Sequence, residues 1–202
     1  MSSPAVDLTQ PIIVGRTGNH HQVVKSVATA SLTVFLSSPT LPIWSEWLDS
    51  GPAKSVRKVK GASHLDKILD WAADTRTPVA RVNGTIALCP MRYEHMPSWV
   101  RGAQVNSVAF PNTPATNDDG EITIHVLSEL STGKAAAQAA HALWAWHLDY
   151  ASWSPAQQLR ISFLDQEALT HVAQNTPGAI PVVDIGLTEV SYGTLTAVAT
   201  HS

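Results

Sequence analysis

Cysteine, long hydrophobic runs and a secretory signal are scarce or missing in this 202-residue sequence. A single cysteine, Cys89, excludes an internal disulfide framework and is typical of proteins of the reducing cytoplasm. The longest weakly polar run, SVATASLTVFL, is too short to span a bilayer and contains hydroxyl groups. The first residues, MSSPAVDLTQP, lack the basic segment and apolar core of a secretory signal. We therefore expect a cytoplasmic protein without a membrane partner.

Metal-binding patterns are also missing, although the chain has nine histidines. His20 and His21 are adjacent and cannot easily bind one ion together. Neither a His-Glu-x-x-His motif nor a pair of cysteines is present. We therefore expect no metal and no cofactor.

Positive charge is scarce in the second half of the chain. Residues 121–202 contain two basic residues, Lys134 and Arg160, against seven acidic ones. Because phosphate contacts require cations, a nucleic acid would have to be bound mainly by the first half. The candidate RNA-binding segment there is KSVRKVK, with the basic residues Lys54, Arg57, Lys58 and Lys60. The alternative is that these side chains form an ordinary solvated face of a strand.

Hydrophobic periodicity in the second half predicts a small α/β unit. EITIHVL alternates apolar and polar residues like a strand, and the alanine-rich segment GKAAAQAAHALWAW predicts a strong helix. Further along, QQLRISF predicts a strand, DQEALTHVAQNT a helix, and IPVVDIG and GTLTAVAT two more strands. This β-α-β-α-β-β order predicts a small mixed β-sheet flanked by helices.

The first half repeats this order more faintly. PIIVG, KSVRKVK and TPVARVNG predict strands, with HHQVVKSVATASLTVFL and SHLDKILDWAAD as helices between them. A gapless shift of 112 residues places Ile12 on Ile124 and Val14 on Val126. This self-similarity predicts a duplicated α/β unit, so that the chain is a pseudo-dimer. The alternative is that any two α/β units look alike at this level. The expected division is a disordered N-terminus over 1–10, a degenerate α/β unit over 11–110, a linker over 111–120 and a second unit over 121–202.

The alanine-rich helix carries three polar side chains on one face. At about 100° per residue, Lys134, Gln138 and His141 lie within about 60° of one another. Ala145 extends this face as a small, open position, while Leu143 lies on the opposite side, where the helix would pack. Taken singly, such a lysine or histidine is usually an ordinary surface or interior residue.

Two motifs in the second half resemble the type 2 peptidyl-tRNA hydrolase family. GKAAAQAAHA is similar to the family's G-K-x-A-A-Q-x-x-H-A helix. DIGLTEVSYGTLTAVA is similar to its closing D-A-G-x-T-x-x-x-x-G-T-x-T motif with the apolar strand that follows. The resemblance covers residues 121–202. It implies a four-stranded mixed sheet, often paired as a homodimer, and hydrolysis of the ester that joins a peptide to tRNA.

The resemblance also implies a set of site residues. These are Lys134, His141 and Asp184 as catalytic residues and Gln138, Thr188 and Thr196 as substrate-binding residues. Lys134 lies in the first helical turn, where free N–H groups and the helix dipole would help it to stabilise an oxyanion or a phosphate. Asp184 would orient a water molecule or hold Lys134, and His141 would transfer a proton or stack on a base.

Three departures from the family pattern leave other functions open. The loop before the helix is shortened and keeps one lysine, Glu189 replaces the usual Gln, and Tyr192 replaces the usual Pro. Across the 112-residue shift, Gln22, Ser26 and Thr29 stand where the helix has its three polar residues, so the first unit would have lost the site. The alternatives are an inactive module that binds tRNA or another partner, and a hydrolase or anion-binding domain for small molecules.

Overall fold

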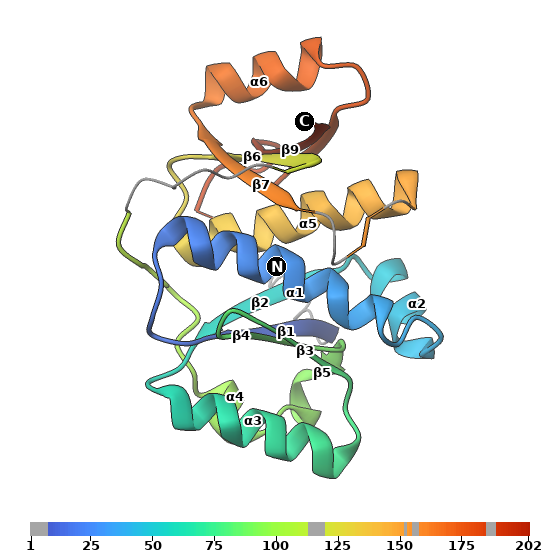
Figure 1. Cartoon of the computed structure of the whole chain (residues 1–202), viewed down its shortest axis with the longest axis vertical. Helices are drawn as coiled ribbons and strands as arrows, with labels where there is room; N and C mark the ends of the chain where they lie inside the picture. The colour runs from blue at the N-terminus through green and yellow to red at the C-terminus, as the bar shows by residue number, and fades with distance from the viewer. Residues whose placement is uncertain (1–7, 113–119, 152, 155–157, 185–188) are drawn as a thin grey trace.

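Two mixed sheets with helices on both faces form the protein, which confirms the expected α/β class (Figure 1). The computed structural model describes residues 8–112, 120–151, 153–154, 158–184 and 189–202. The first unit contains β1 (Leu8–Val14), α1 (His20–Leu36), α2 (Pro42–Asp49), β2 (Ala53–Lys58), α3 (Ala62–Thr75), β3 (Val79–Val82), β4 (Thr85–Leu88), β5 (Met91–Arg92), the 3₁₀ helix η1 (Tyr93–His95) and α4 (Ser98–Arg101). The second contains β6 (Ile122–Leu127), α5 (Thr132–Tyr150), β7 (Leu159–Leu164), α6 (Gln166–Asn175), β8 (Ile180–Val183) and β9 (Leu195–His201).

The two sheets have the same strand order and the same strand directions. The first is ordered β2-β1-β4-β3 and the second β7-β6-β9-β8. In each, the first pair is parallel and the other two pairs are antiparallel. The registers also correspond: the row Val56, Ile12, Ala87 and Ala80 matches the row Ile161, Ile124, Ala199 and Ile180. The units thus share one architecture, while their origin by duplication stays a prediction.

Helices α1 and α5 pack against each other between the two sheets, and α6 and α3 cover the outer faces (Figure 1). Helix α5 buries five alanines, such as Ala136, and α1 buries Ala28 and Ala30; these small side chains let the two backbones approach closely. At their first residues, His20 Nδ1 lies 2.9 Å from Thr132 Oγ1. One hydrophobic core runs through both units, and a second, smaller one lies in the first unit, where residues of α3 such as Leu65 and Ile68 pack on the sheet.

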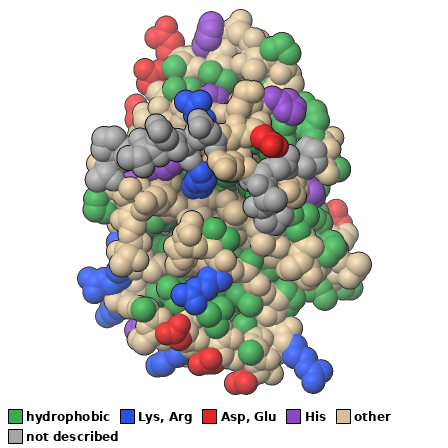
Figure 2. All heavy atoms as spheres, in the orientation of Figure 1, with side chains coloured by type: hydrophobic (Ala, Val, Ile, Leu, Met, Phe, Trp, Pro, Cys, Tyr) green, Lys and Arg blue, Asp and Glu red, His purple; other side chains and the backbone are tan. Residues whose placement is uncertain are grey.

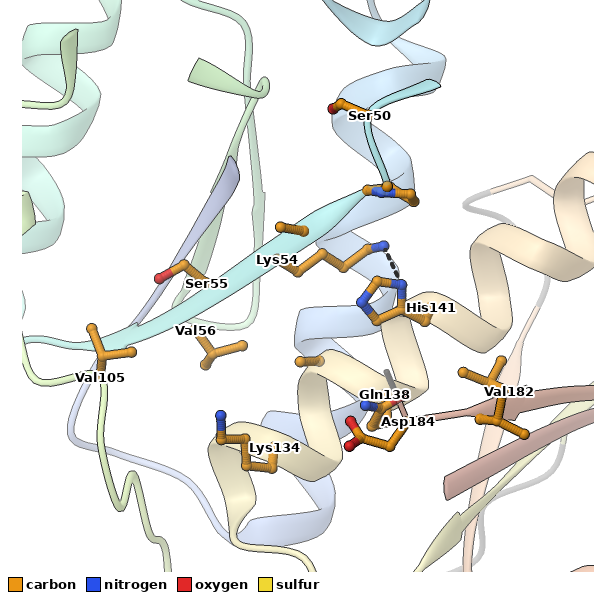
Figure 3. Close-up of a pocket in the computed structure, with 16 residues that line it drawn as sticks. Ser50, Lys54, Ser55, Val56, Val105, Lys134, Gln138, His141, Val182 and Asp184 are labelled. Atoms are coloured by element: carbon orange, nitrogen blue, oxygen red, sulfur yellow. Dashed lines mark hydrogen bonds between the residues drawn. The ribbon is translucent and has the colours of Figure 1, made fainter. Parts of the chain in front are cut away.

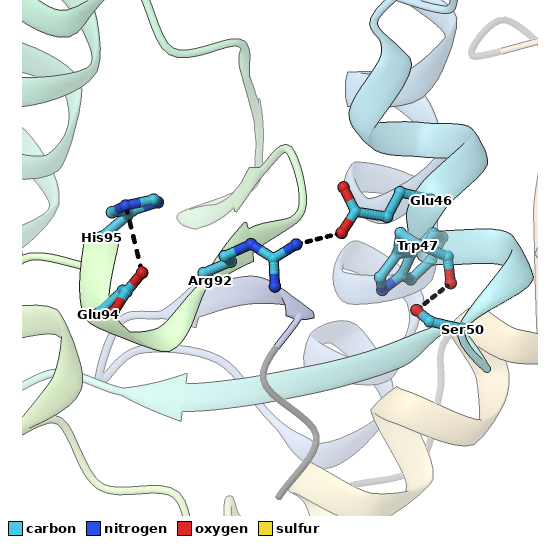
Figure 4. Close-up of polar contacts among 6 residues, drawn as sticks. All are labelled: Glu46, Trp47, Ser50, Arg92, Glu94 and His95. Atoms are coloured by element: carbon cyan, nitrogen blue, oxygen red, sulfur yellow. Dashed lines mark hydrogen bonds and ion pairs between the residues drawn. The ribbon is translucent and has the colours of Figure 1, made fainter.

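Helix α2 is an addition to the first unit that reaches across to the second. Its Trp44 and Trp47 pack against Trp144 of α5, with ring centroids 5.6 and 5.0 Å away. An ion pair between Arg92 and Glu46 ties α2 to the edge of the first sheet, and Ser50 Oγ donates to the Trp47 carbonyl (Figure 4). These contacts fix the segment that leads into β2.

Several boundaries differ from the sequence prediction. Strand β1 begins at Leu8, within the stretch expected to be disordered, and the rest of that stretch lies outside the described residues. Most of the expected linker, 113–119, also lies outside them. Strand β4 was not predicted. It follows β3 through a tight hairpin turn at Asn83 and Gly84, whose φ angles are positive, at 45° and 80°. Among the described residues, no helix is long and apolar enough to cross a bilayer.

Candidate functional site

A pocket of about 410 Å³ lies between the two units. One wall is the polar face of α5, with Lys134, Gln138 and His141, together with Asp184 at the end of β8 (Figure 3). The other wall is segment 50–56 of the first unit, which includes the first four residues of edge strand β2. The structure therefore brings together four of the six residues that the family resemblance implies.

The start of α5 is held close to the chain segment before the second unit. The Gly133 amide donates to the Val108 carbonyl at 3.0 Å, and a Cβ on Gly133 would lie 3.0 Å from the Val108 Cβ. A larger residue here would require Val108 to move by a few tenths of an ångström. The contact fixes the position of this end of α5, where the next residue, Lys134, lines the pocket.

The N-terminus of α5 is less open than the sequence suggested. The carboxylate of Glu189 accepts from the Ser131 amide at 3.0 Å and from the Ser131 hydroxyl at 2.8 Å. A carboxylate here is favourable because it faces the positive end of the helix dipole. This accounts for an acid at position 189. With the amides of Ser131 and Gly133 both engaged, charge stabilisation in the pocket depends on Lys134.

A hydrogen bond from the buried Thr196 hydroxyl orients the side-chain amide of Gln138. The Thr196 hydroxyl lies 2.9 Å from Gln138 Oε1 and 3.1 Å from the Val182 carbonyl, so its one proton can serve either acceptor. The contact leaves Gln138 Nε2 as the donor end of the amide for a ligand. Thr196 itself is fully buried and does not line the pocket. It is therefore placed to support Gln138 rather than to bind substrate directly, and Thr188 lies outside the described residues.

Two hydrogen bonds hold the main chain of Asp184 in place. Its amide donates to the Thr194 carbonyl and its carbonyl accepts from the Gly193 amide, both at 2.8 Å. Only 1% of the residue is exposed, and Figure 3 shows its carboxylate beside Gln138, on the side where Lys134 lies. These two bonds fix the main chain of Asp184 at the wall of the pocket, where its carboxylate can orient a water molecule.

A lysine and a histidine from different units meet in the pocket. Lys54 Nζ lies 3.1 Å from His141 Nδ1 (Figure 3). Burial lowers the pKa of Lys54 well below its ordinary value. Burial, and then the charge of Lys54, lower the pKa of His141 well below its ordinary value. The neutral imidazole that results can carry its proton on Nε2 while Nδ1 accepts from Lys54.

The place of Lys54 was not predicted from the sequence. Its amine lies 4.7 Å from the ring of Trp47 and 5.7 Å from that of Trp144, and both rings favour the ammonium form while burial opposes it. The only available signal was the alternation of the strand, which turns Lys54 and Lys58 to one side of β2. Nothing in the local sequence indicates that this side faces α5.

The other basic residues of the KSVRKVK segment do not line this pocket. Arg57 is buried and donates to the carbonyls of Val100 and Arg101. Lys58 Nζ donates to the Ala109 carbonyl at 2.7 Å, and only Lys60 is exposed. On the face shown in Figure 2, basic side chains are separated and interspersed with acidic ones. The four candidates are thus not gathered on one surface, and an RNA-binding role for them stays a prediction.

The first unit keeps a cavity at the equivalent place. Gln22 and Ser26, which the 112-residue shift equates with Lys134 and Gln138, line a pocket of about 420 Å³. No ionisable residue is among the described residues that line it. The two pockets are therefore similar in volume and different in charge.

Comparisons with known proteins do not place the chain in a family. No family model matches it, and no curated protein matches it either. Among the described residues, no group of three or more His, Cys, Asp or Glu side chains could hold a metal ion.

Proposed function

We propose that the pocket on α5 hydrolyses the ester bond between a peptidyl group and tRNA. One observation carries the proposal: Lys134, Gln138, His141 and Asp184, which the family resemblance implies, line one cavity. The first three share one face of α5, whereas Asp184 lies 43 residues after His141 and reaches the cavity from another element. A cavity of about 410 Å³ is also of the size that small-molecule sites have.

The residues present suffice for a hydrolytic step. Asp184 orients a water molecule and accepts its proton as the water oxygen attacks the ester carbonyl. Lys134 and the Gln138 amide stabilise the oxyanion that forms. The ester C–O bond then breaks, and His141 Nε2 donates its proton to the leaving ribose oxygen while Nδ1 takes a proton from the Lys54 ammonium, so that the ring stays neutral. Lys54 lies against Nδ1 of the same ring and holds it in the tautomer that this step needs.

The direct test is the release of free tRNA from an N-acetyl-aminoacyl-tRNA by the purified chain. Hydrolysis that is lost in Asp184→Asn, with tRNA binding retained, supports the proposal. Binding without hydrolysis in the unaltered chain supports instead an inactive module on the same fold. The assay therefore separates the two functions with one substrate.

A second candidate, an esterase for smaller acyl esters, is favoured by the scarcity of available cations. Arg57 is buried and Lys58 is engaged by the Ala109 carbonyl, so two of the four residues nominated for phosphate contacts are committed elsewhere. An N-acetyl-aminoacyl ester of adenosine distinguishes the candidates. Equal kcat/KM for this ester and for the tRNA ester favours the small substrate.

A further inference from the structure

A second, mainly apolar compartment adjoins the pocket. It has a volume of about 230 Å³ and shares Lys54 and His141 with the main pocket as a common wall. Its remaining walls include Trp47, Leu48, Trp144, Ala145, Leu148 and Pro181. It therefore continues along α5 from the site, on the far side of the lysine–histidine pair. Ala145 is the small, open position that extends the polar face of this helix.

The chemistry of the walls selects an apolar occupant. Apart from Lys54 and His141 at the inner end, every residue that lines the compartment is apolar. A nucleobase would need hydrogen-bond partners for its polar edges, and the apolar walls supply none. An aliphatic or aromatic side chain needs only the apolar contact that these walls offer.

We propose that this compartment binds the large apolar or aromatic side chain of the acyl residue whose ester is cleaved in the main pocket. The inference rests on the proposed function and names the substrate class for it. The substrates are esters of N-blocked amino acids with side chains such as those of Phe or Leu. A volume of about 230 Å³ is several times the roughly 30 Å³ that one water molecule occupies in the liquid, which leaves room for one such side chain.

The arrangement along α5 gives the bound substrate a direction. Lys134, Gln138, His141 and Ala145 follow one another on one helix face, and the first and last are separated by about 16 Å along the axis. The cation of Lys134 is at the end where the ribose and its phosphate would lie. The apolar compartment is at the other end, and the ester carbonyl lies between them, against Gln138 and His141.

Substrate selectivity provides the test. One tRNA carrying N-acetyl-Phe, N-acetyl-Leu, N-acetyl-Gly or N-acetyl-Asp is offered to the full chain. The Phe and Leu esters should exceed the Gly ester in kcat/KM by about ten- to a hundred-fold, from burial of the side chain, and the Asp ester should be the poorest. Ala145→Phe fills the compartment and should reduce the Phe-to-Gly ratio to about one. Asp149→Ala, on the same helix but outside the compartment, should leave the ratio unchanged.

A second variant and a binding measurement keep the test independent of folding and of catalysis. Leu148 is 56% exposed at the rim, so Leu148→Glu should fold normally and lower the ratio several-fold. N-acetyl-phenylalaninamide, which is not an ester, should perturb the tryptophan fluorescence of the unaltered chain and not of Ala145→Phe. N-acetyl-glycinamide should have no effect on either.

The outcomes separate this inference from the proposed function. If the Phe amide binds and Ala145→Phe abolishes its binding but no ester is cleaved, the compartment stands and the proposed hydrolysis fails. If esters are cleaved with equal kcat/KM for Phe and Gly, the compartment is overturned and the hydrolysis stands. If the amide does not bind to the unaltered chain, the compartment is also overturned.

Discussion

Lys54 Nζ and His141 Nδ1 are 3.1 Å apart, although the two residues are separated by 87 positions and belong to different units. The pair lies on the wall that the main pocket shares with the apolar compartment. A protonated lysine can only donate to the ring, which leaves the imidazole proton on Nε2. The protonation state of Lys54 therefore determines whether Nε2 of His141 acts as a donor.

The first prediction concerns the pH dependence of hydrolysis. Because burial and Lys54 lower the pKa of His141, the imidazole stays neutral at pH values where an ordinary histidine is protonated. The acid limb of kcat/KM should therefore lie below pH 6.5. Lys54→Met removes the neighbouring cation, raises the pKa of His141 and should move this limb upward. A limb that does not move in Lys54→Met would mean that another group is being titrated.

Lys54→Met should also make the protein more stable. Burial lowers the pKa of Lys54, so between that lowered value and about 10.5 the unfolded chain binds more protons than the folded one. Stability therefore rises with pH across this window, and below it the buried amine costs free energy. We expect Lys54→Met to raise the free energy of unfolding by about 1 kcal/mol at pH 7, with the difference shrinking toward pH 10.5. Urea titrations of both proteins at pH 7 and pH 9 measure it.

Lys134→Ala and Asp184→Asn should each lower ester hydrolysis by about two orders of magnitude, which is usual for the loss of oxyanion or acid–base help. Asp184→Asn keeps the shape of a side chain that is 1% exposed. The double variant should be little worse than either single one, since groups that act together are not additive. The matched controls are Gln22→Ala and Thr29→Ala in the first unit. Equal losses in the controls would mean that both units are active.

Thr132→Val should destabilise the contact between the units. The Thr132 hydroxyl lies 2.9 Å from His20 Nδ1 and accepts from the Phe110 amide at 3.1 Å, and the residue is buried. Valine has the same shape but leaves both partners unsatisfied, at a cost of about 1–3 kcal/mol. Urea unfolding should show a lower midpoint with a single transition, because one core serves both units. Thr40→Val, at an exposed site, should have no measurable effect.

The salt dependence of tRNA binding tests the basic segment. Lys60 is exposed, whereas Lys58 would have to leave the Ala109 carbonyl to reach a phosphate. If both contact the backbone, Lys58→Ala with Lys60→Ala should reduce the slope of log Kd against log salt by about two, roughly one for each lost phosphate contact. Lys67→Ala, on the outer helix α3, is the control. An unchanged slope would show that phosphates are bound elsewhere.

Much of the fold was predictable because its signals are local. Alternating residues mark β6, and the 3.6-residue period with abundant alanine marks α5. The hairpin at Asn83 and Gly84 was not predicted, because a glycine after a strand also marks the end of that strand. Helix α2 was missed because it is short and its tryptophans pack on the other unit.

The site was predictable only in part, for a related reason. Helix phase alone groups Lys134, Gln138 and His141, because their spacing fixes their directions. Asp184 was placed by the family resemblance and not by periodicity. Lys54 could be found only from the structure, because its contact with His141 depends on how the two units pack. Local patterns carry no information about that packing.

The position of the pocket between the units has a consequence for how this protein can change over time. A dimer of identical chains would repeat each substitution at two symmetric sites, so a change that helps one wall is imposed on the other. In this chain the wall at Lys54 and the wall at His141 are encoded separately. The uncharged cavity of the first unit is likewise free to vary. Substrate preference can therefore be altered by mutations in the first unit, which carries none of Lys134, Gln138, His141 and Asp184.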